Sequence, residues 1–331
     1  MTEAQRDTFY TACPYNCWPA SCGMALQVKD GKVVSISGNP HHDISRGKLC
    51  VRGQCASQII YSDRRLKYPL QRVKGKKKGM WKRVSWENAL DIIASRMQAN
   101  IKKGEHEANA IYQGHGNLVH KLNWSVLVPR FANMFGLTMW DANFPCWYDI
   151  GLGQKMCGYH GVMDPVEMGR KSACLVNWAQ DPAASMPNMI QDIMKLKARG
   201  GKVVTIDPRV TQTAALSDVH IRPRPGTDAV LANAVANMII RAELYDKDFV
   251  ENCTRGFERY REFVGEYSLE YSAGICGVPE EQIQELAIIF AKQKPLCLNL
   301  SRGALGKHSN GFIVTHAILC AFALTGNIGK E

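Results

Sequence analysis

Four cysteines near the N-terminus carry the clearest chemistry in this sequence of 331 residues. Cys13, Cys17 and Cys22 crowd into the segment CPYNCWPASC, and Cys50 follows 27 intervening residues later in LCVRG. Three thiolates on one short loop, together with a fourth on a returning segment, can close around a cube of iron and sulfide. The grouping therefore predicts a [4Fe-4S] cluster.

Two other uses of these cysteines stay open at this point. Tetrahedral zinc also accepts four thiolates, although structural zinc sites usually pair their cysteines as two short knuckles, which a three-plus-one grouping fits poorly. Buried apolar cysteines or disulfides are the other alternative. They leave unexplained why a third of the twelve cysteines lie in this region.

The bulk composition, 46% hydrophobic and 21% charged residues, is that of an ordered soluble protein with two or more domains. The N-terminal residues MTEAQRDTFYTAC do not have the pattern of an export signal. No run of eighteen apolar residues predicts a transmembrane segment. In such a chain the cysteines are expected to remain thiols or metal ligands, so we expect a cytoplasmic protein.

The net charge of +11 raises the question of nucleic-acid binding. Much of the excess is local, because the segment RVKGKKKGMWKR (72–83) carries seven basic residues and no acidic one. Its glycines and its single aromatic residue, Trp81, indicate a solvated hairpin tip. A basic surface also suits an anionic cofactor or an acidic electron-transfer partner, and we expect no nucleic-acid partner.

The hydrophobic patterns divide the chain into two kinds of structure. Residues 8–60 are expected to form strands and loops, since MALQVKDGKVVSISGNP alternates apolar and polar residues around Asp30-Gly31. From Trp81 onward helices alternate with strands, and SACLVNW, KVVTIDPR and PLCLNL are continuous apolar runs typical of buried parallel strands. The predicted fold class is α/β, with a small N-terminal β-rich domain followed by doubly wound α/β domains.

Helices and domain boundaries follow from the same patterns. Ser85 is the expected N-cap of a helix that ends at Gly104. Further helices are expected near 188–198, 228–242, 280–292 and 312–324. The predicted domains are an iron-sulfur domain at 1–62, the first part of an α/β domain at 63–135, and a nucleotide-binding α/β domain at 136–331. The final ALTGNIGKE is a turn that normally leads into more structure, so we expect a fragment or one piece of a split catalytic unit.

Several motifs resemble a known family. They follow one another from Cys13 to Gly329 as the cysteine loop, DGKVVSISGNP, LCVRG, YPL, SWENALDIIA, NWAQDP, IDPR and RPGTD. Their combined order resembles the N-terminal part of the catalytic subunit of the molybdenum or tungsten bis-pterin oxidoreductases of the dimethyl sulfoxide reductase family. The gap from Cys17 to Cys22 is one residue longer than that family's usual spacing. The resemblance implies a [4Fe-4S] cluster, molybdopterin guanine dinucleotide (bis-MGD), and molybdenum or tungsten as cofactors.

The resemblance also implies a role for Arg52, which occupies the position of a basic residue that the family places between cluster and pterin. A cation there would stabilise the reduced cluster and bridge the electron path, whereas a surface ion pair is the structural alternative. The strand-end acids Asp181 and Asp207 can accept hydrogen bonds from ribose or guanine, and Arg209 can clamp phosphate. The other predicted nucleotide contacts are Gln180, Thr227 and Asp228, of which Asp228 could be only a first-turn helix acid.

The family supplies one side chain to the metal, and the segment DANFPCWYDIGLGQKMCGYHG matches that region. Cys146 falls at the expected place; Cys157 is a nearby competitor, and a structural role for both is the alternative. Trp147 follows Cys146, where formate dehydrogenases of the family typically have histidine, so formate is disfavoured as the substrate. His115 and His160 could line the pocket as proton donors, or could be satisfied structural groups.

We expect an oxidoreductase in which a small-molecule substrate reacts at the metal. Its electrons would pass through the pterin and the cluster to an iron-sulfur electron-transfer subunit. One alternative is a non-redox hydratase of the same family, although Trp18 after Cys17 stands where that subgroup has a catalytic Asp. Another is a cluster-bearing electron-transfer or assembly subunit. In each case we expect a second chain that completes the catalytic unit.

Overall fold

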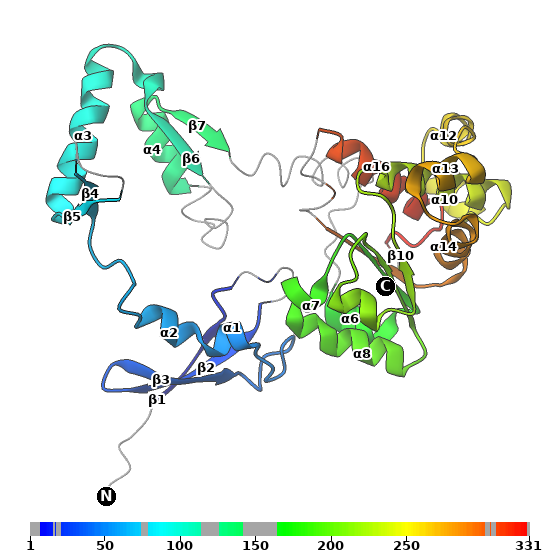
Figure 1. Cartoon of the computed structure of the whole chain (residues 1–331), viewed down its shortest axis with the longest axis horizontal. Helices are drawn as coiled ribbons and strands as arrows, with labels where there is room; N and C mark the ends of the chain where they lie inside the picture. Colours follow the sequence, from blue (N-terminus) through cyan, green and yellow to red (C-terminus); the bar gives the residue numbers. More distant parts are fainter. Residues whose placement is uncertain are drawn as a thin grey trace, which may run out of the picture. The chain divides into compact units, whose positions relative to one another are not determined.

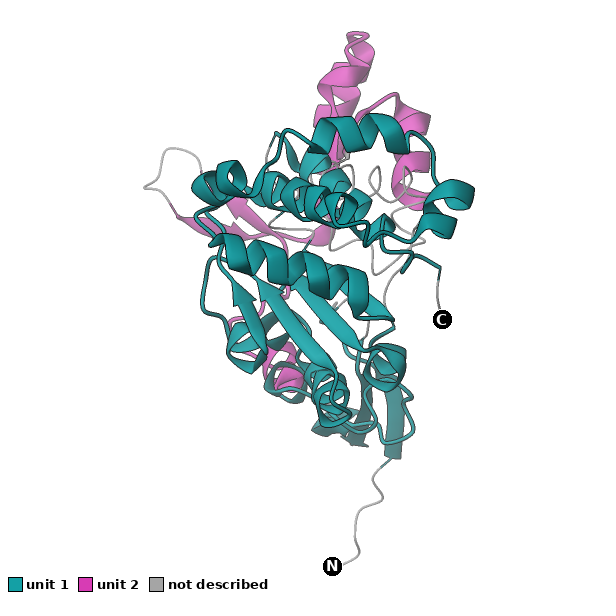
Figure 2. Cartoon of the chain, turned by 90° about the vertical axis from the view of Figure 1, so that its right-hand side faces the viewer, with its two compact units in different colours: residues 1–54, 145–331 teal, residues 55–144 magenta. Residues whose placement is uncertain are grey.

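The computed structural model describes most of the chain, namely residues 7–15, 17, 21–73, 79–113, 126–141, 164–301, 305 and 309–329. The chain forms two compact units, shown in different colours in Figure 2. Unit 1 comprises residues 1–54 and 145–331, and unit 2 comprises residues 55–144. The domain boundaries expected from the sequence stay a prediction.

The N-terminal part of unit 1 is a small antiparallel sheet in the order β1-β2-β3. Its strands are β1 (Asp7–Ala12), β2 (Gly23–Lys29) and β3 (Lys32–Gly38), and the short helix α1 (Val51–Gln54) follows. The β2-β3 hairpin turns at Asp30 and Gly31, which both have positive φ angles, 50° and 72°. A two-residue type I′ turn requires this conformation. The predicted β-rich domain and its hairpin are therefore confirmed.

The larger part of unit 1 contains a four-stranded parallel sheet in the order β10-β9-β8-β11. The strands are β8 (Cys174–Trp178), β9 (Lys202–Ile206), β10 (Val219–Ile221) and β11 (Leu296–Leu300). The chain moves from β8 outward to β9 and β10, and then crosses back to place β11 on the other side of β8. The strand order thus reverses between β8 and β11. In open α/β sheets the crevice at such a point is where ligands bind.

Helices cover both faces of this sheet, which confirms the doubly wound α/β fold (Figure 1). One face carries α6 (Pro165–Lys171), α7 (Pro182–Ser185), η4 (Pro187–Met189) and α8 (Ile190–Ala198). The other carries α10 (Asp228–Arg241), α14 (Glu280–Lys292) and α16 (Gly311–Ala323). The smaller helices are α9 (Gln212–Leu216), α11 (Lys247–Cys253), α12 (Phe257–Val264) and α13 (Leu269–Cys276).

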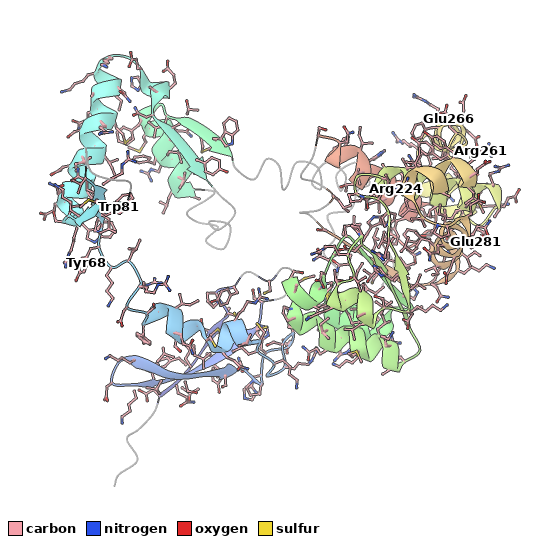
Figure 3. All side chains as sticks on the ribbon, viewed as in Figure 1. Tyr68, Trp81, Arg224, Arg261, Glu266 and Glu281 are labelled. Atoms are coloured by element: carbon pink, nitrogen blue, oxygen red, sulfur yellow. The ribbon has the colours of Figure 1, made fainter. Side chains whose placement is uncertain are left out.

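The main core lies between the sheet and the α10–α14–α16 layer. Phe290 packs edge-to-face on both Trp178 and Phe322, with ring centres 6.3 and 6.5 Å apart. Burying an apolar side chain of this size contributes about 1.5–3 kcal/mol. Arg224, labelled in Figure 3, donates to the carbonyl oxygen of Gly274 at 2.7 Å and so ties α13 to the segment that leads into α10. This part of unit 1 has a core of its own.

Unit 2 is built from short elements. They are α2 (Ala56–Ile60), β4 (Leu70–Arg72), β5 (Trp81–Arg83), α3 (Trp86–Lys102), η1 (His106–Ala108), β6 (Ala110–Gln113), α4 (Val128–Phe135) and β7 (Thr138–Asp141). β4 pairs antiparallel with β5, as the predicted basic hairpin requires, and residues 74–78 of its tip lie outside the described residues. β6 pairs parallel with β7. Ser85 caps α3 by accepting from the amide of Asn88 at 3.1 Å, which confirms the predicted N-cap.

Unit 2 leaves its apolar side chains exposed. α3 has no buried residue, and Leu90 and Ile93 of its apolar face are 59% and 55% exposed. The guanidinium of Arg83 lies 3.1 Å from the centre of the Tyr68 ring, a cation–π contact at the unit's surface (Figure 3). In neither unit does any described helix combine the length and the apolar composition needed to cross a membrane.

Candidate functional site

The strands of the β-rich domain bring the four N-terminal cysteines together. Cys13 follows β1 and Cys22 precedes β2, and the amide of Cys13 donates to the carbonyl oxygen of Cys22 at 2.8 Å. Cys50 arrives at the start of α1. Burial raises the pKa of Cys22 to about 11, and charge on Cys13, Cys17 and Cys50 adds to the rise. The four thiols are therefore close enough to interact electrostatically.

Four cysteine thiols can hold either a zinc ion or an iron-sulfur cluster. Among the described residues, no group of three or more His, Cys, Asp and Glu side chains is placed to hold a metal ion. A zinc ion draws its thiolates to one centre at about 2.3 Å, whereas in an iron-sulfur cube each thiolate binds its own iron and the sulfur atoms stay further apart. All four thiols are free in this structure, as either use requires.

Arg52 lies between the cysteines and the α/β sheet. Its Nη2 atom is 3.9 Å from Cys17 Sγ and donates to the carbonyl oxygen of Ala184, in α7, at 3.3 Å. Burial opposes ionisation of Cys50, but hydrogen bonds from the Gly53 amide and the Arg52 guanidinium lower the pKa of Cys50 below its usual value. Arg52 thus lies beside the cysteine thiols, and its expected place between cluster and pterin stays a prediction, as does its role in electron transfer.

The loop after β8 holds Gln180 and Asp181. Asp181 Oδ1 accepts from Thr213 Oγ1 at 2.5 Å, and Gln180 Nε2 donates to Ser185 Oγ at 3.3 Å. Ala179, the first residue of the loop, has a φ of 54°, a conformation that is uncommon for a non-glycine residue. Its amide is held by the carbonyl oxygen of Ile206 in β9 at 2.7 Å. The backbone at this strand end is therefore fixed in an unusual conformation, as is common at ligand sites.

Asp207 and Arg209 form the loop after β9. The Asp207 side chain is 5% exposed, and its Oδ1 accepts from the Arg209 amide at 2.8 Å. The Arg209 side chain is 71% exposed and touches Asp207 only at 3.4 Å. Most of its guanidinium donors are therefore available for an anion, while the Asp207 carboxylate is largely committed to the turn.

Thr227 and Asp228 begin α10. Thr227 Oγ1 donates to the carbonyl oxygen of Arg224 at 2.7 Å, and Asp228 Oδ1 accepts from Trp178 Nε1 at 2.8 Å. Asp228 thus satisfies a buried indole and ties the start of α10 to the end of β8. This bond joins residues fifty positions apart and was not foreseen from the sequence. Its only signal is that a buried tryptophan N–H needs an acceptor.

Strands β8 and β11, between which the strand order reverses, carry a pair of polar side chains. Asn177 in β8 pairs with Asn299 in β11, whose amide nitrogen donates to Asn177 Oδ1 at 2.9 Å. The amide nitrogen of Asn177 is buried and has no hydrogen-bond partner among the described atoms. A buried donor of this kind is usually satisfied by water or a ligand. Separately, the exposed guanidinium of Arg209, in the loop after β9, fits the phosphate of a bound nucleotide.

Four of the predicted residues therefore lie at the carboxyl ends of β8 and β9: Gln180, Asp181, Asp207 and Arg209. Asp228 is bonded to Trp178, the last residue of β8. Sequence reasoning missed Trp178, and it missed Thr213, whose hydroxyl orients Asp181. Other predicted residues lie outside the described part of the chain: Cys146, Cys157, Trp147, His115 and His160.

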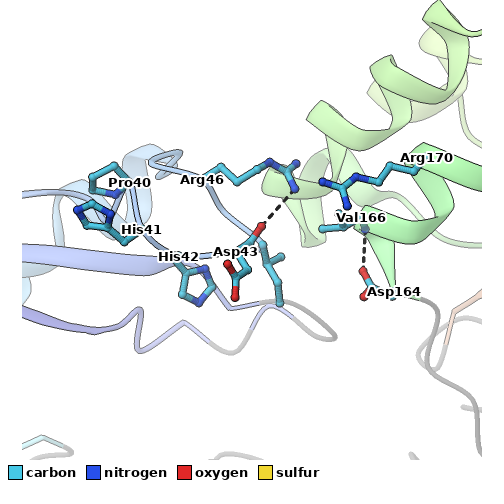
Figure 4. Close-up of a pocket in the computed structure, with 9 residues that line it drawn as sticks. Pro40, His41, His42, Asp43, Arg46, Asp164, Val166 and Arg170 are labelled. Atoms are coloured by element: carbon cyan, nitrogen blue, oxygen red, sulfur yellow. Dashed lines mark hydrogen bonds between the residues drawn. The ribbon is translucent and has the colours of Figure 1, made fainter.

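A separate cavity of about 490 Å³ lies beside the loop at 40–46 and helix α6 (Figure 4). Its charged lining includes Asp43, Arg46, Asp164 and Arg170. None of the predicted site residues lines it.

Known protein families match most of this chain. Residues 65–331 match the model of the molybdopterin oxidoreductase family, and residues 7–62 match that of its Fe4S4 domain. The F420-dependent formate dehydrogenase subunit alpha of Methanocaldococcus jannaschii is 32% identical over 97% of this chain and 46% of its own length. The dimethyl sulfoxide reductase of Escherichia coli is 29% identical over 99% of this chain and 44% of its own. A solved acetylene hydratase from Pelobacter acetylenicus superposes with a TM-score of 0.80 at 28% identity, over 97% of this chain and 44% of that one.

The chain therefore belongs to the dimethyl sulfoxide reductase family of molybdopterin oxidoreductases, as its motifs predict. The two matched domains imply a [4Fe-4S] cluster and a molybdenum or tungsten bis-pterin as its cofactors. The chain spans less than half the length of the relatives described above.

Proposed function

We propose that this chain forms the N-terminal part of the catalytic unit of a molybdenum- or tungsten-dependent oxidoreductase. A small substrate would be oxidised or reduced at the bis-pterin metal, which supplies the redox chemistry when it is bound. Electrons would pass through the [4Fe-4S] cluster. The observation that carries this proposal is the placement of Arg52, whose guanidinium contacts the cysteine thiols on one side and α7 on the other.

In this proposal the chain has two sites, one that holds the cluster and one that holds the pterin nucleotide. The cation of Arg52 would offset the negative charge that the cluster gains on reduction. At the carboxyl edge, Arg209 would clamp a phosphate of the pterin nucleotide, and Asp181 would accept from its hydroxyl or amide groups. Asp228 would support this edge through Trp178. Cys146 as the metal ligand, with His115 and His160 as proton donors, completes the proposal.

The match to an acetylene hydratase favours hydration without net electron transfer as the second candidate. That relative is a hydratase, whereas the formate dehydrogenase and the dimethyl sulfoxide reductase are named for redox reactions. Steady-state reduction or oxidation of a viologen dye separates the two, because hydration needs no net electrons.

We also propose two partners. The remainder of the catalytic unit, called the complementary polypeptide below, would cover unit 2, since the relatives are more than twice as long as these residues and unit 2 exposes apolar side chains. An iron-sulfur electron-transfer subunit would accept or deliver electrons at the cluster. The cytoplasmic location expected from the sequence stays a prediction.

The proposed function is tested most sharply by removing one cofactor without the other. One substitution should remove the cluster and another the pterin nucleotide. Cys50→Ala should abolish the iron-sulfur absorbance, because a cube with one thiolate missing is labile. Arg209→Met should lower the pterin nucleotide content while leaving the absorbance intact. Both are measured on the chain prepared with its complementary polypeptide, by iron analysis and by fluorescence of the released pterin.

Cys253→Ala is the matched control, since Cys253 is an exposed free thiol on α11, outside both sites. It should leave iron and pterin at wild-type levels. Retention of full iron by Cys50→Ala would remove Cys50 from the ligand set. Unchanged pterin in Arg209→Met would refute the placement of the nucleotide.

A further inference from the structure

The loop from Asn39 to Cys50 is fastened firmly to the β-rich sheet. The amide of Asn39 donates to the carbonyl oxygen of Gly23, and its own carbonyl oxygen accepts from Gly47 at 2.9 Å. Ser45 is fully buried, and its hydroxyl accepts from the Gly23 amide at 3.0 Å. These bonds hold the loop against Gly23 of β2, and the C-terminal end of the loop carries Cys50.

Arg46 stands out within this loop. Its φ is 46°, in the left-handed region that costs free energy for a side chain other than glycine and persists only where the surroundings hold it. Figure 4 shows the side chain extending from the loop toward the helices of the α/β sheet. Its Nη1 donates to the carbonyl oxygen of Asp43 at 3.3 Å, and its Nη2 donates to Asp192 Oδ1 at 2.6 Å.

The partner carboxylate lies deep beside the sheet. The Asp192 side chain, on α8, is 1% exposed, and its second oxygen has no hydrogen-bond partner among the described atoms. Lys195 approaches Oδ1 only at 3.6 Å. Arg46 is thus the nearer cation to a buried negative charge, and removal of one member of such a pair strands the other. Next to it, Gln191 Nε2 donates to the carbonyl oxygen of Ile44 at 3.3 Å.

The same stretch is held again six residues later. Arg52 donates to the carbonyl oxygen of Ala184 in α7, close in sequence to α8. Between these two attachments lies Cys50, whose carbonyl oxygen accepts from the Gln54 amide at 3.1 Å. Hydrogen bonds therefore join the chain to α8 before Cys50, at Arg46, and to α7 after Cys50, at Arg52.

We propose that Arg46 and Asp192 are a positioning pair for electron transfer. The pair fixes the chain segment of Cys50 and Arg52 against the α7–α8 side of the sheet, and so fixes the cluster relative to the edge where the pterin nucleotide is proposed to bind. Arg46 acts through Arg52 and Cys50 and does not itself touch the cofactors. The electron-transfer part of this inference rests on the proposed function.

The test compares Arg46→Met and Arg46→Lys with a control variant, Lys197→Met, which also removes one cation from an ion pair. Lys197→Met breaks the Lys197–Asp218 pair, which is 2.5 Å long and lies wholly within the α/β domain. The Lys197 side chain is 26% exposed, as is that of Arg46. Amide hydrogen exchange of residues 44–54 is measured in the full chain, together with the midpoint potential of the cluster.

Arg46→Met should accelerate exchange in 44–54 by about tenfold, the factor expected for loss of one charge-assisted hydrogen bond. It should also move the cluster potential in the same direction as Arg52→Met does. Arg46→Lys should restore both values most of the way, since it keeps the charge. Combining Arg46→Met with Asp192→Asn should perturb exchange less than Arg46→Met alone, because no charge is then stranded.

The proposal is overturned if Arg46→Met leaves exchange and potential at wild-type values, or if Lys197→Met changes them equally. A potential that shifts opposite to that of Arg52→Met would also overturn it. Failure of the proposed function gives a different result from failure of the positioning pair, because the wild-type chain would then take up no iron. Exchange in residues 44–54 would still report whether Arg46 holds the loop on α8.

Discussion

Units 1 and 2 both contain parallel strands and helices, but only unit 1 buries its apolar side chains in a core. In unit 1, four parallel strands lie between two helical layers, and β8 is buried along its whole length. In unit 2, two parallel strands accompany α3 and α4, and among its described residues Ala56 and Ala132 are the buried apolar ones. Both regions have amphipathic helices and paired strands. They differ in how much of the apolar surface of these elements is covered by other parts of the chain.

A two-stranded sheet has too little area to form a core of its own. Trp140 of β7 is 63% exposed and Tyr112 of β6 is 75% exposed, so apolar side chains of both strands await a covering surface. Because the relatives are more than twice as long as this chain, the rest of such a catalytic unit is the cover that we propose. Unit 1 should then behave as a folded body alone, and unit 2 as one that is stabilised by a partner.

The largest expected effect comes from one substitution made in both regions. Leu231 in α10 is fully buried, whereas Leu90 in α3 is 59% exposed. Leu231→Ala should lower the free energy of unfolding by about 2–5 kcal/mol, because it leaves a cavity in a packed core. Leu90→Ala should change it by no more than about 0.5 kcal/mol in the chain alone. Urea denaturation followed by circular dichroism measures both.

The complementary polypeptide provides the control for this pair. In its presence Leu90→Ala should become destabilising, since the same side chain is then covered, while the effect of Leu231→Ala should stay unchanged. Equal costs of the two substitutions in the isolated chain would contradict the contrast between the units.

A smaller effect is expected from the pH dependence of stability. Burial opposes ionisation of Asp218, but hydrogen bonds from Lys197 and the Val203 amide lower the pKa of Asp218 below its usual value. A carboxyl group with a depressed pKa stabilises the fold above its unfolded-state pKa of about 3.9, and that stabilisation is lost as the pH falls through its folded-state pKa. Asp218→Asn should therefore cost less than about 1 kcal/mol at pH 7, since the side chain is 40% exposed.

The difference between wild type and Asp218→Asn should shrink as the pH falls toward the folded-state pKa of Asp218, where its carboxyl group becomes neutral. Asp91→Asn on the exposed surface of α3 is the counterpart in unit 2, and it controls for the loss of one carboxylate. A constant difference at every pH would show that the Asp218 carboxylate is not the source of the effect. Thermal unfolding from pH 3 to 7 decides this.

Local patterns sufficed for the fold of unit 1. The helix expected at 280–292 is observed as Glu280–Lys292, and the Asp30-Gly31 hairpin forms as the turn chemistry requires. They could not predict that the apolar face of α3 is left uncovered, because a helical period shows which face is apolar and not what lies against it.

The site was predictable to the same degree. Strand ends and cysteine spacing singled out Asp181, Asp207 and Cys50 from local pattern, and their roles in a site stay predictions. The bonds of Asp228 to Trp178 and of Arg46 to Asp192 join residues that are 50 and 146 positions apart. Such partners are set by how the layers pack, and a single sequence does not show which distant residues meet.

The central claim is that these 331 residues hold a complete cluster site but only part of the metal–pterin site. Metal analysis of the chain purified alone, and again with its complementary polypeptide, tests it most directly. The account predicts about four irons per chain in both preparations. It predicts molybdenum or tungsten and dye-linked turnover only in the second. Stoichiometric bis-pterin metal with turnover from the chain alone, or a chain without iron in either preparation, would contradict it.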